Sequence, residues 1–290
     1  DVETNITNNT PVVTAMPTTY TIPKSTAFVL TAVATDPDNN PLTYCWEQVD
    51  YSTLANGVGK ASGTGDGAAA IGANTSGGTF RSIAPTSNPT RYFPKLATVL
   101  GGAVKNVSDF EAASSVARTT NFRVTVRDNV TGGQAQTAYA NQVIVVGSAA
   151  AFTVNAASGK AGTPLNVTWT VSGTTASPYN VANVKIDYTI DGGANWTVLS
   201  ASTANTGTAS VTFPASLGAS TPYVRVSAIG NVFYAVNKVT LTASLATSEN
   251  TKDQVQIYPN PATDKLFVKN ISAKSTYSIF DATGRLVSEG

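Results

Sequence analysis

Short runs in which apolar and polar residues alternate recur along most of the chain. In residues 122–126, Phe122, Val124 and Val126 alternate with polar residues, so one face is apolar and the other is polar. Comparable runs occupy residues 28–33, 42–49, 142–146, 165–171, 184–190, 211–213, 224–226 and 239–241. Gly, Pro, Asn and Asp separate these runs, which is typical of turns. The pattern predicts an all-β fold of antiparallel β-sandwiches. Long stretches with helical spacing are absent, and one short helix is predicted at residues 108–116, with Ser108 as N-cap and Glu111 three residues later.

The order of these runs divides the chain into tandem immunoglobulin-like or fibronectin-like sandwiches and a partial third β module. The predicted parts are an N-terminal linker at 1–10, a first sandwich at 11–147, a second immunoglobulin-like sandwich at 148–244, a polar linker at 245–254 and the partial module at 255–290. The first sandwich contains a long insertion, at about 52–118, rich in Gly, Ala and Ser. We expect part of the insertion to pack down through Phe80, Arg91, Tyr92, Phe93 and Leu96.

Composition narrows the classes of function. The chain is 42% hydrophobic, which is enough to form cores, and only 12% charged. Its net charge is +1, from 18 basic and 17 acidic residues, so a nucleic-acid partner is not expected. Apolar runs are far shorter than the roughly 20 residues of a transmembrane helix. No signal peptide opens the chain at Asp1, and we expect either a removed signal or an internal piece of a longer protein.

Catalytic residues are not predicted. The chain has no histidine and one cysteine, which excludes Ser-His-Asp triads, Cys-His dyads, zinc sites of the H-E-x-x-H type and intrachain disulfides. Cys45 lacks a histidine base and is expected to be an inert thiol. Neighbouring acids, such as Asp109 with Glu111, lie at turns or beside the insertion, and nothing in the sequence brings a pair into a cleft.

Oxygen-bearing residues alternate in the segment 34–44. Asp36, Asp38 and Asn40 stand at every second position, and Asp128 follows the strand at 122–126. Ca²⁺ takes six to eight oxygen ligands, so these four residues are a candidate Ca²⁺ site. In the alternative, which we favour, the side chains cap turn amides. The segment resembles the D-P-D-G-D-P-L-T-Y turn of cadherin-like and PKD-like sandwiches, and this resemblance implies that Asp128 lies near the turn. Apart from Ca²⁺, no cofactor is expected.

Residues 189–196, T-I-D-G-G-A-N-W, match the Asp-box pattern S/T-x-D-x-G-x-x-W. In such a box the aspartate accepts backbone N–H groups in a hairpin turn, glycine adopts a positive φ, and tryptophan packs against the strands. We therefore interpret Asp191, Gly193 and Trp196 as a structural motif.

Two sequence blocks characterise the last module. The first is Tyr258, Pro259, Asn260 and Pro261, and the second contains Asp281, Gly284 and Arg285. The prolines favour an extended start, and Asp281 with Gly284 favours a tight turn between two strands. The module resembles the C-terminal sorting domain of proteins exported by the type IX secretion system of Bacteroidetes. The family's later strands and final basic end are absent after Gly290.

A second resemblance covers most of residues 10–245. The segments that carry it are 79–82, 91–94, 120–129, 167–174, 182–186, 191–193 and 229–234. They resemble the sandwich modules that follow the catalytic domain of secreted reprolysin-like zinc metalloproteases from the same bacteria. The zinc motif of those enzymes is absent, so the resemblance implies no catalytic residue here.

These observations predict a non-catalytic accessory and secretion-targeting region of an exported protein. The type IX translocon is the expected partner, and the expected location is outside the cell or on the outer-membrane surface of a Gram-negative bacterium. Two alternatives remain open. One is an adhesin or carbohydrate-binding module with a glycan or another surface protein as partner, and the other is a set of substrate-holding modules of an upstream zinc metalloprotease.

Overall fold

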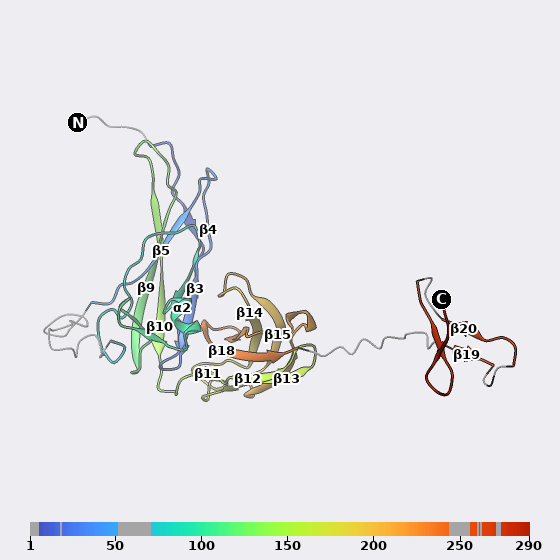
Figure 1. Ribbon diagram of the computed structural model, residues 1–290. Coiled ribbons are helices and arrows are strands. Elements are labelled where there is room, and N and C mark those ends of the chain that lie inside the picture. The colour runs from blue at the N-terminus through green and yellow to red at the C-terminus, as the bar shows by residue number, and fades with distance from the viewer. Residues whose placement is uncertain are drawn as a thin grey trace, which may run out of the picture. The chain divides into compact units, whose positions relative to one another are not determined.

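The structure is a computed structural model that describes residues 6–17, 19–51, 71–243, 256–259, 261, 263–270 and 274–290. The chain divides into two compact units, residues 1–244 and residues 245–290. Strands dominate the described residues of both units (Figure 1). The all-β fold class that the alternation predicts is therefore confirmed.

A four-stranded sheet forms one side of the first module. In spatial order its strands are β2 (Thr19–Ile22), β10 (Thr137–Val146), β9 (Arg118–Arg127) and β5 (Thr43–Gln48). The long strands β9 and β10 pair antiparallel, whereas β2 runs parallel to β10. Phe122, Val124 and Val126 of β9 are fully buried, so the apolar face of this run points into the core. A two-stranded ladder joins β1 (Val12–Val13) to β4 (Ala34–Thr35).

A seven-stranded sheet continues from the first module into the second. Its path is β15 (Thr197–Ala204), β14 (Asn183–Thr189), β17 (Tyr223–Ala228), β18 (Phe233–Thr242), β3 (Ala27–Thr31) and β6 (Thr90–Phe93), with β12 (Ala157–Lys160) parallel to β18. The modules join where Phe233 of β18 pairs with Phe28 of β3, and Tyr234 with Ala27. The module boundary at residue 147 stays a prediction, and this sheet contains strands from both sides of it.

A three-stranded sheet covers the other side of the second module. Its strands are β11 (Thr153–Val154), β13 (Pro164–Thr170) and β16 (Thr208–Thr212), and the 3₁₀ helix η1 (Ala215–Leu217) follows β16. Buried apolar side chains from both modules form one continuous core. It includes Phe28, Phe93 and Phe122 from the first module, and Val167 and Phe213 from the second.

Residues 71–117 of the predicted insertion pack onto the first module, while residues 52–70 lie outside the described residues. Its strand β6 pairs with β3, and its Phe80 and Phe93 side chains are buried. The helix α2 (Leu96–Leu100) and the hairpin of β7 (Lys105–Asn106) and β8 (Glu111–Ala112) follow. The expectation that part of the insertion packs down is confirmed.

The helix predicted at residues 108–116 is wrong. Asn106 Oδ1 accepts the backbone N–H groups of Ser108 at 3.0 Å and Asp109 at 3.2 Å, which forms a turn where the N-cap was expected. The Glu111 side chain is fully buried and its Oε1 lies 2.9 Å from the guanidinium of Arg91. These contacts with the rest of the module outweigh the local helix signal.

The second unit consists of two short hairpins in its described part. β19 (Gln256–Tyr258) pairs with β20 (Phe267–Lys269), and β21 (Ser278–Phe280) pairs with β22 (Leu286–Glu289). None of the helices that the structure describes combines the length and apolar character needed to cross a membrane.

Candidate functional site

The turn proposed for Ca²⁺ is organised by its own aspartates. Asp36 Oδ1 accepts the backbone N–H groups of Asp38 at 2.9 Å and Asn40 at 3.0 Å. Asp38 accepts the backbone and side-chain N–H groups of Asn9 at 2.7 and 2.9 Å. These contacts are those of turn capping. However, Asp36 Oδ2 is buried and has no hydrogen-bond partner among the described residues.

Asn8 connects this turn to Asp128. Its Nδ2 donates to Asp128 Oδ2 at 2.5 Å, and its Oδ1 accepts the Asn40 side chain at 2.9 Å. Asp128 is fully buried and also accepts the backbone N–H of Gln136 at 2.9 Å. Burial alone would raise the pKa of Asp128, but the hydrogen bonds from Gln136, Asn8 and Val130 outweigh it and hold the pKa below its usual value. Within the described ranges, no three acidic, histidine or cysteine side chains are grouped as metal ligands, and the Ca²⁺ site stays a prediction.

The Asp-box residues form the hairpin turn between β14 and β15. Asp191 Oδ1 accepts the Thr189 hydroxyl at 2.6 Å and the Asn195 backbone N–H at 3.0 Å. These bonds hold the pKa of Asp191 below its usual range. Gly193 has a φ of 90°, and a Cβ there would lie 2.3 Å from Leu96 Cδ2. The turn therefore packs against α2 of the first module.

The Asp-box tryptophan belongs to a cluster that the sequence analysis missed. The guanidinium of Arg225 lies 3.7 Å from the ring centroid of Trp196 and makes two 2.8 Å hydrogen bonds to Asp187. Arg225 also donates to the Tyr92 hydroxyl of β6 at 3.2 Å. Burial lowers the pKa of Arg225, but the hydrogen bonds and the negative charge of Asp187 outweigh this effect, so the pKa of Arg225 is raised. The available signal was one acidic residue, Asp187, in the middle of the 184–190 run and one basic residue, Arg225, in the middle of the 224–226 run.

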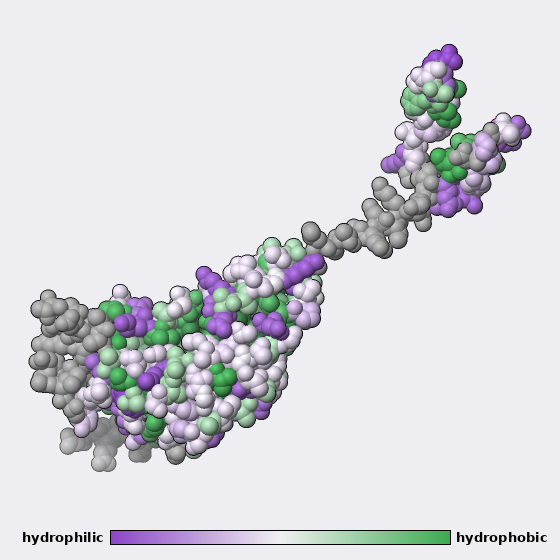
Figure 2. Space-filling model, turned by 90° about the horizontal axis from the view of Figure 1, so that it is seen from below, coloured by the Kyte–Doolittle hydropathy of each residue, from purple (hydrophilic) through white to green (hydrophobic). Residues whose placement is uncertain are grey.

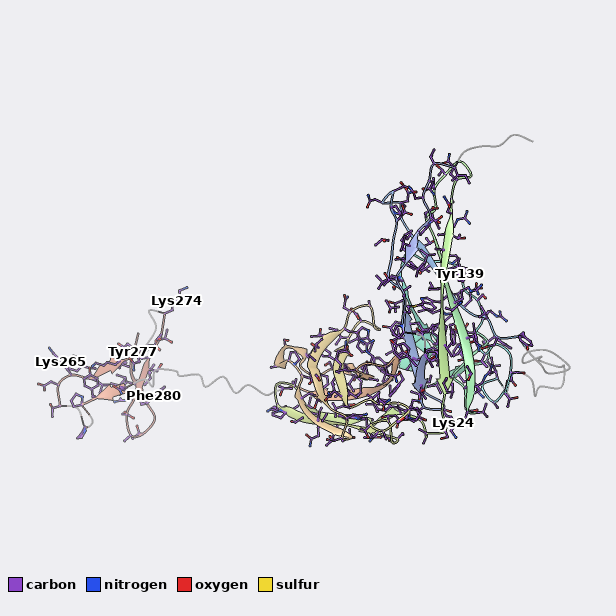
Figure 3. The ribbon with its side chains drawn as sticks, turned by 180° about the vertical axis from the view of Figure 1, so that it is seen from behind. Lys24, Tyr139, Lys265, Lys274, Tyr277 and Phe280 are labelled. Atoms are coloured by element: carbon purple, nitrogen blue, oxygen red, sulfur yellow. The ribbon has the colours of Figure 1, made fainter. Side chains whose placement is uncertain are left out.

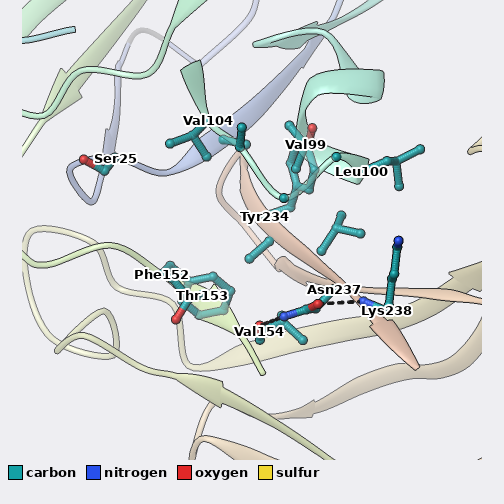
Figure 4. A pocket seen from close by; sticks show the side chains of 16 residues that line it. Ser25, Val99, Leu100, Val104, Phe152, Thr153, Val154, Tyr234, Asn237 and Lys238 are labelled. Atoms are coloured by element: carbon teal, nitrogen blue, oxygen red, sulfur yellow. Dashed lines mark hydrogen bonds between the residues drawn. The ribbon is translucent and has the colours of Figure 1, made fainter. Parts of the chain in front are cut away.

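A pocket of about 480 Å³ lies where the two modules meet (Figure 4). Val99 and Val104 line it from the first module, and Phe152, Val154 and Tyr234 line it from the second. Asn237 closes one side: its side chain donates to the Val154 carbonyl at 2.8 Å and accepts the Lys238 N–H at 2.8 Å. Lys238 is the one charged residue in the lining, so the pocket lacks an acid–base pair for catalysis.

The single thiol has no reactive environment. Cys45 Sγ lies 3.4 Å from the Ile83 carbonyl oxygen. Burial, followed by the nearby charge of Glu47, raises the pKa of the thiol. A raised pKa disfavours the thiolate, which is the nucleophilic form.

The motif residues of the C-terminal unit build its two hairpins. Asp281 Oδ1 accepts the backbone N–H groups of Thr283 at 2.9 Å and Arg285 at 3.1 Å, and Gly284 has a φ of 86°. The hydrogen bonds from Thr283 and Arg285 lower the pKa of Asp281. This turn uses the same contact as Asp191, an aspartate that accepts the N–H four residues later.

At the other end of the unit, Tyr258 stacks on Phe267 with ring centroids 5.7 Å apart. Pro259 and Pro261 follow, and Asn260 lies outside the described residues.

Large apolar side chains of the C-terminal unit are exposed. Tyr277 is 56% exposed and Phe280 is 60% exposed, and both are labelled in Figure 3. Figure 2 shows strongly apolar side chains on this unit, whereas much of the visible surface of the larger unit has intermediate hydropathy. Exposed apolar patches of this kind mark interaction surfaces.

The fold and these turns define an all-β protein of tandem immunoglobulin-like sandwiches with a short C-terminal β unit. Residues 256–290 match the family described as "Secretion system C-terminal sorting domain". This match supports the predicted type IX sorting segment and implies a secreted or cell-surface protein that interacts with the type IX secretion system. A sorting segment is a non-catalytic kind of module.

Solved structures similar to the chain include tandem immunoglobulin and cadherin repeats. Tandem Ig repeats of Dlar are 7% identical, with a TM-score of 0.37, and the match covers 81% of this chain and 97% of that one. Mouse cadherin-23 EC22-24 is 14% identical, with a TM-score of 0.28, and the match covers 82% and 67%. Sidekick-1 immunoglobulin domains 1-5 are 13% identical, with a TM-score of 0.25, and the match covers 85% and 40%, so this chain spans less than half of that structure.

The search of curated proteins found no match. None of the matches described above is an accessory module of a metalloprotease, so that resemblance stays a prediction.

Proposed function

We propose that residues 6–243 form a non-catalytic accessory region that the C-terminal unit directs through the type IX secretion system. The observation that carries this proposal is the match of residues 256–290 to a C-terminal sorting domain. The Asp281 turn and the exposed apolar side chains of the two hairpins give this segment a defined shape and a surface that a translocon can contact.

The nature of the larger unit supports an accessory role. Its sheets share one continuous core, and its described residues contain no group of three or more acidic, histidine or cysteine side chains that could hold a metal ion. The whole chain contains no histidine. A pair of sandwiches with a shared core is suited to binding or spacing.

Export of the full protein in a Bacteroidetes host tests the proposal. The protein is expressed from its own gene with an epitope in the exposed turn at Gly132–Gly133, in a strain with the type IX system and in one without it. We expect the epitope at the surface or in the medium of the first strain and in the periplasm of the second. Removal of residues 256–290 should also retain the protein in the periplasm.

A matched pair of variants tests the turn itself. Asp281→Ala removes the acceptor of the Thr283 and Arg285 N–H groups and should reduce export. Asp264→Ala changes an exposed acid of the same unit and should not reduce it. Equal export with and without residues 256–290, or in both strains, would refute the proposal.

A further inference from the structure

The outer face of the four-stranded sheet carries an exposed aromatic side chain among polar ones. Because Phe122, Val124 and Val126 of β9 point into the core, the residues between them point outward. On the neighbouring strand β10, Tyr139 is 61% exposed, and Figure 3 labels it beside the long strands of this module. A tyrosine that presents this much of its ring to solvent offers a flat apolar surface with a polar edge.

Arg123 and Asn141 hold positions next to this ring. The two residues lie opposite each other on β9 and β10, and Arg123 Nε donates to Asn141 Oδ1 at 3.0 Å. The guanidinium carbon of Arg123 lies 4.3 Å from the centroid of the Tyr139 ring. The stacking and the Nε bond fix the guanidinium plane, while its two terminal nitrogens have no partner among the described residues. Asn141 Nδ2 likewise has none there. Donors that are already oriented lose little entropy when a ligand binds.

A groove of about 630 Å³ begins at these two side chains. Its lining includes Thr119, Asn121 and Val143 of β9 and β10, together with residues 49–51 and 75–77, and Tyr139 lies outside this lining. Hydroxyl, amide and guanidinium groups therefore line the groove, and its Arg123 stacks on the exposed ring of Tyr139. This combination suits a chain of sugar rings, because apolar C–H faces stack on an aromatic ring while hydroxyls bond to amides.

The charges of this face favour an anion. Asp50, Arg118 and Arg123 are the charged residues that line the groove, and Glu47 of β5, outside this lining, lies opposite Arg123 in the sheet register. The other charged pair at the groove is satisfied internally: Asp50 lies 3.7 Å from Arg118 and accepts the Asn121 backbone N–H at 3.1 Å. Among the groove-lining residues, this leaves the positive charge of Arg123. A planar guanidinium with free terminal nitrogens fits a carboxylate through two parallel hydrogen bonds.

We propose that the groove beside Arg123, Tyr139 and Asn141 binds an anionic polysaccharide, that is, a sugar chain bearing carboxylate groups. The sugar ring stacks on Tyr139, its carboxylate accepts from Arg123, and Asn141 donates to a hydroxyl. Binding at this face does not depend on export, so this proposal and the proposed function can fail separately.

Binding of the purified full-length protein to defined polymers tests the proposal. The probes are polygalacturonate and alginate, with neutral dextran and poly-L-glutamate as comparisons, measured by calorimetry or affinity electrophoresis. We expect binding to at least one of the two uronates, weaker binding to dextran, and no comparable binding to poly-L-glutamate. Tyr139→Ala and Arg123→Gln should each weaken binding at least tenfold, and higher salt should weaken the wild type more than Arg123→Gln.

The matched control is Tyr277→Ala, which removes a tyrosine that is 56% exposed in the C-terminal unit and should leave affinity unchanged. The melting temperature of each variant shows whether it is folded. If Tyr139→Ala or Arg123→Gln is unfolded, Asn141→Ala takes its place in the binding measurement. The proposal is overturned if neither uronate binds, if dextran or poly-L-glutamate binds as well as the uronates, or if the Tyr139, Arg123 and Asn141 variants bind like the wild type.

Discussion

Arg225→Met should destabilise the larger unit strongly, because Arg225 connects elements of both modules. Its guanidinium bonds to Asp187 of β14 and to Tyr92 of β6, and it stacks on Trp196 of the Asp-box turn. Methionine keeps most of the apolar stem, so the variant removes the charge and the hydrogen bonds with little loss of packing.

The size of the stability loss follows from the Asp187 carboxylate, which the variant leaves without its arginine partner. Asp187 is fully buried, and removing one partner of a buried ion pair costs about 3–5 kcal/mol. Lys185 Nζ stays 2.8 Å from Asp187 Oδ2 and compensates part of the lost charge. We therefore expect the low end, a loss of about 3 kcal/mol in the free energy of unfolding. For a unit of this size that corresponds to a fall of roughly 6–12 °C in Tm.

Urea unfolding followed by tryptophan fluorescence and far-UV circular dichroism measures this loss. Arg81→Met is the matched control, because the exposed Arg81 lies over the Phe110 ring at 5.8 Å and is unpaired with any carboxylate among the described residues. The control should change stability by less than about 0.5 kcal/mol.

A double variant separates the ion pair from general disruption. Arg225→Met with Asp187→Leu removes both charges, and replacing a buried pair by apolar residues is often neutral or stabilising. The double variant should therefore be more stable than Arg225→Met alone. A loss below 0.5 kcal/mol in the single variant, or a double variant less stable than the single one, would refute the reasoning.

Two further predictions concern the aspartates of the larger unit. If Ca²⁺ binds at Asp36 Oδ2, adding a chelator should lower Tm, and Asp36→Asn should abolish this difference. The lost stability should be about 2.7 kcal/mol when the free ion was a hundredfold above its Kd. A Tm that does not respond to the chelator supports the capping interpretation. The pKa values of Asp128 and Asp191 are lowered in the folded state, so their stabilisation is fully present above the unfolded pKa of about 4 and is lost as pH falls through the lowered folded values. Urea midpoints measured from pH 7 to 2.5 should therefore drop in acid, less steeply for Asp128→Asn, and a midpoint that rises below pH 4 would contradict this sign.

The strands could be predicted from the sequence because each carries its own signal. The alternation in residues 122–126 marks which side chains are buried, and the structure places Phe122, Val124 and Val126 in the core accordingly. In residues 184–190 the alternation is right for Val184, Ile186 and Tyr188 but wrong at the far end, because Thr189 is buried and Ile190 is 67% exposed. It also misses that Asp187 is fully buried. The Asp191 and Asp281 turns were also visible, since an aspartate with a glycine one to three positions later favours a local turn.

Contacts between distant segments could not be predicted in this way. The pairing of β3 with β18 joins residues about two hundred positions apart through two residue pairs, and no periodicity records it. The helix expected at 108–116 was wrong for a related reason: Glu111 has the spacing of a capping residue, but Arg91 of β6 pairs with it in the core. A local pattern cannot include a partner that only the fold brings near.

The scarcity of charge in this chain gives its few buried ion pairs a specific role. Apolar sheets pack on one another with little preference among alternatives, whereas a buried guanidinium requires one particular partner. Arg225 fixes β17 against β14 and the Asp-box turn, and Arg91 fixes β6 against Glu111. Both arginines therefore orient the insertion of the first module. Arg91 lies within the insertion, and Arg225 lies in the second module. Because β6 also extends the shared sheet, the module that carries the groove beside Arg123 shares both a sheet and a core with the second module.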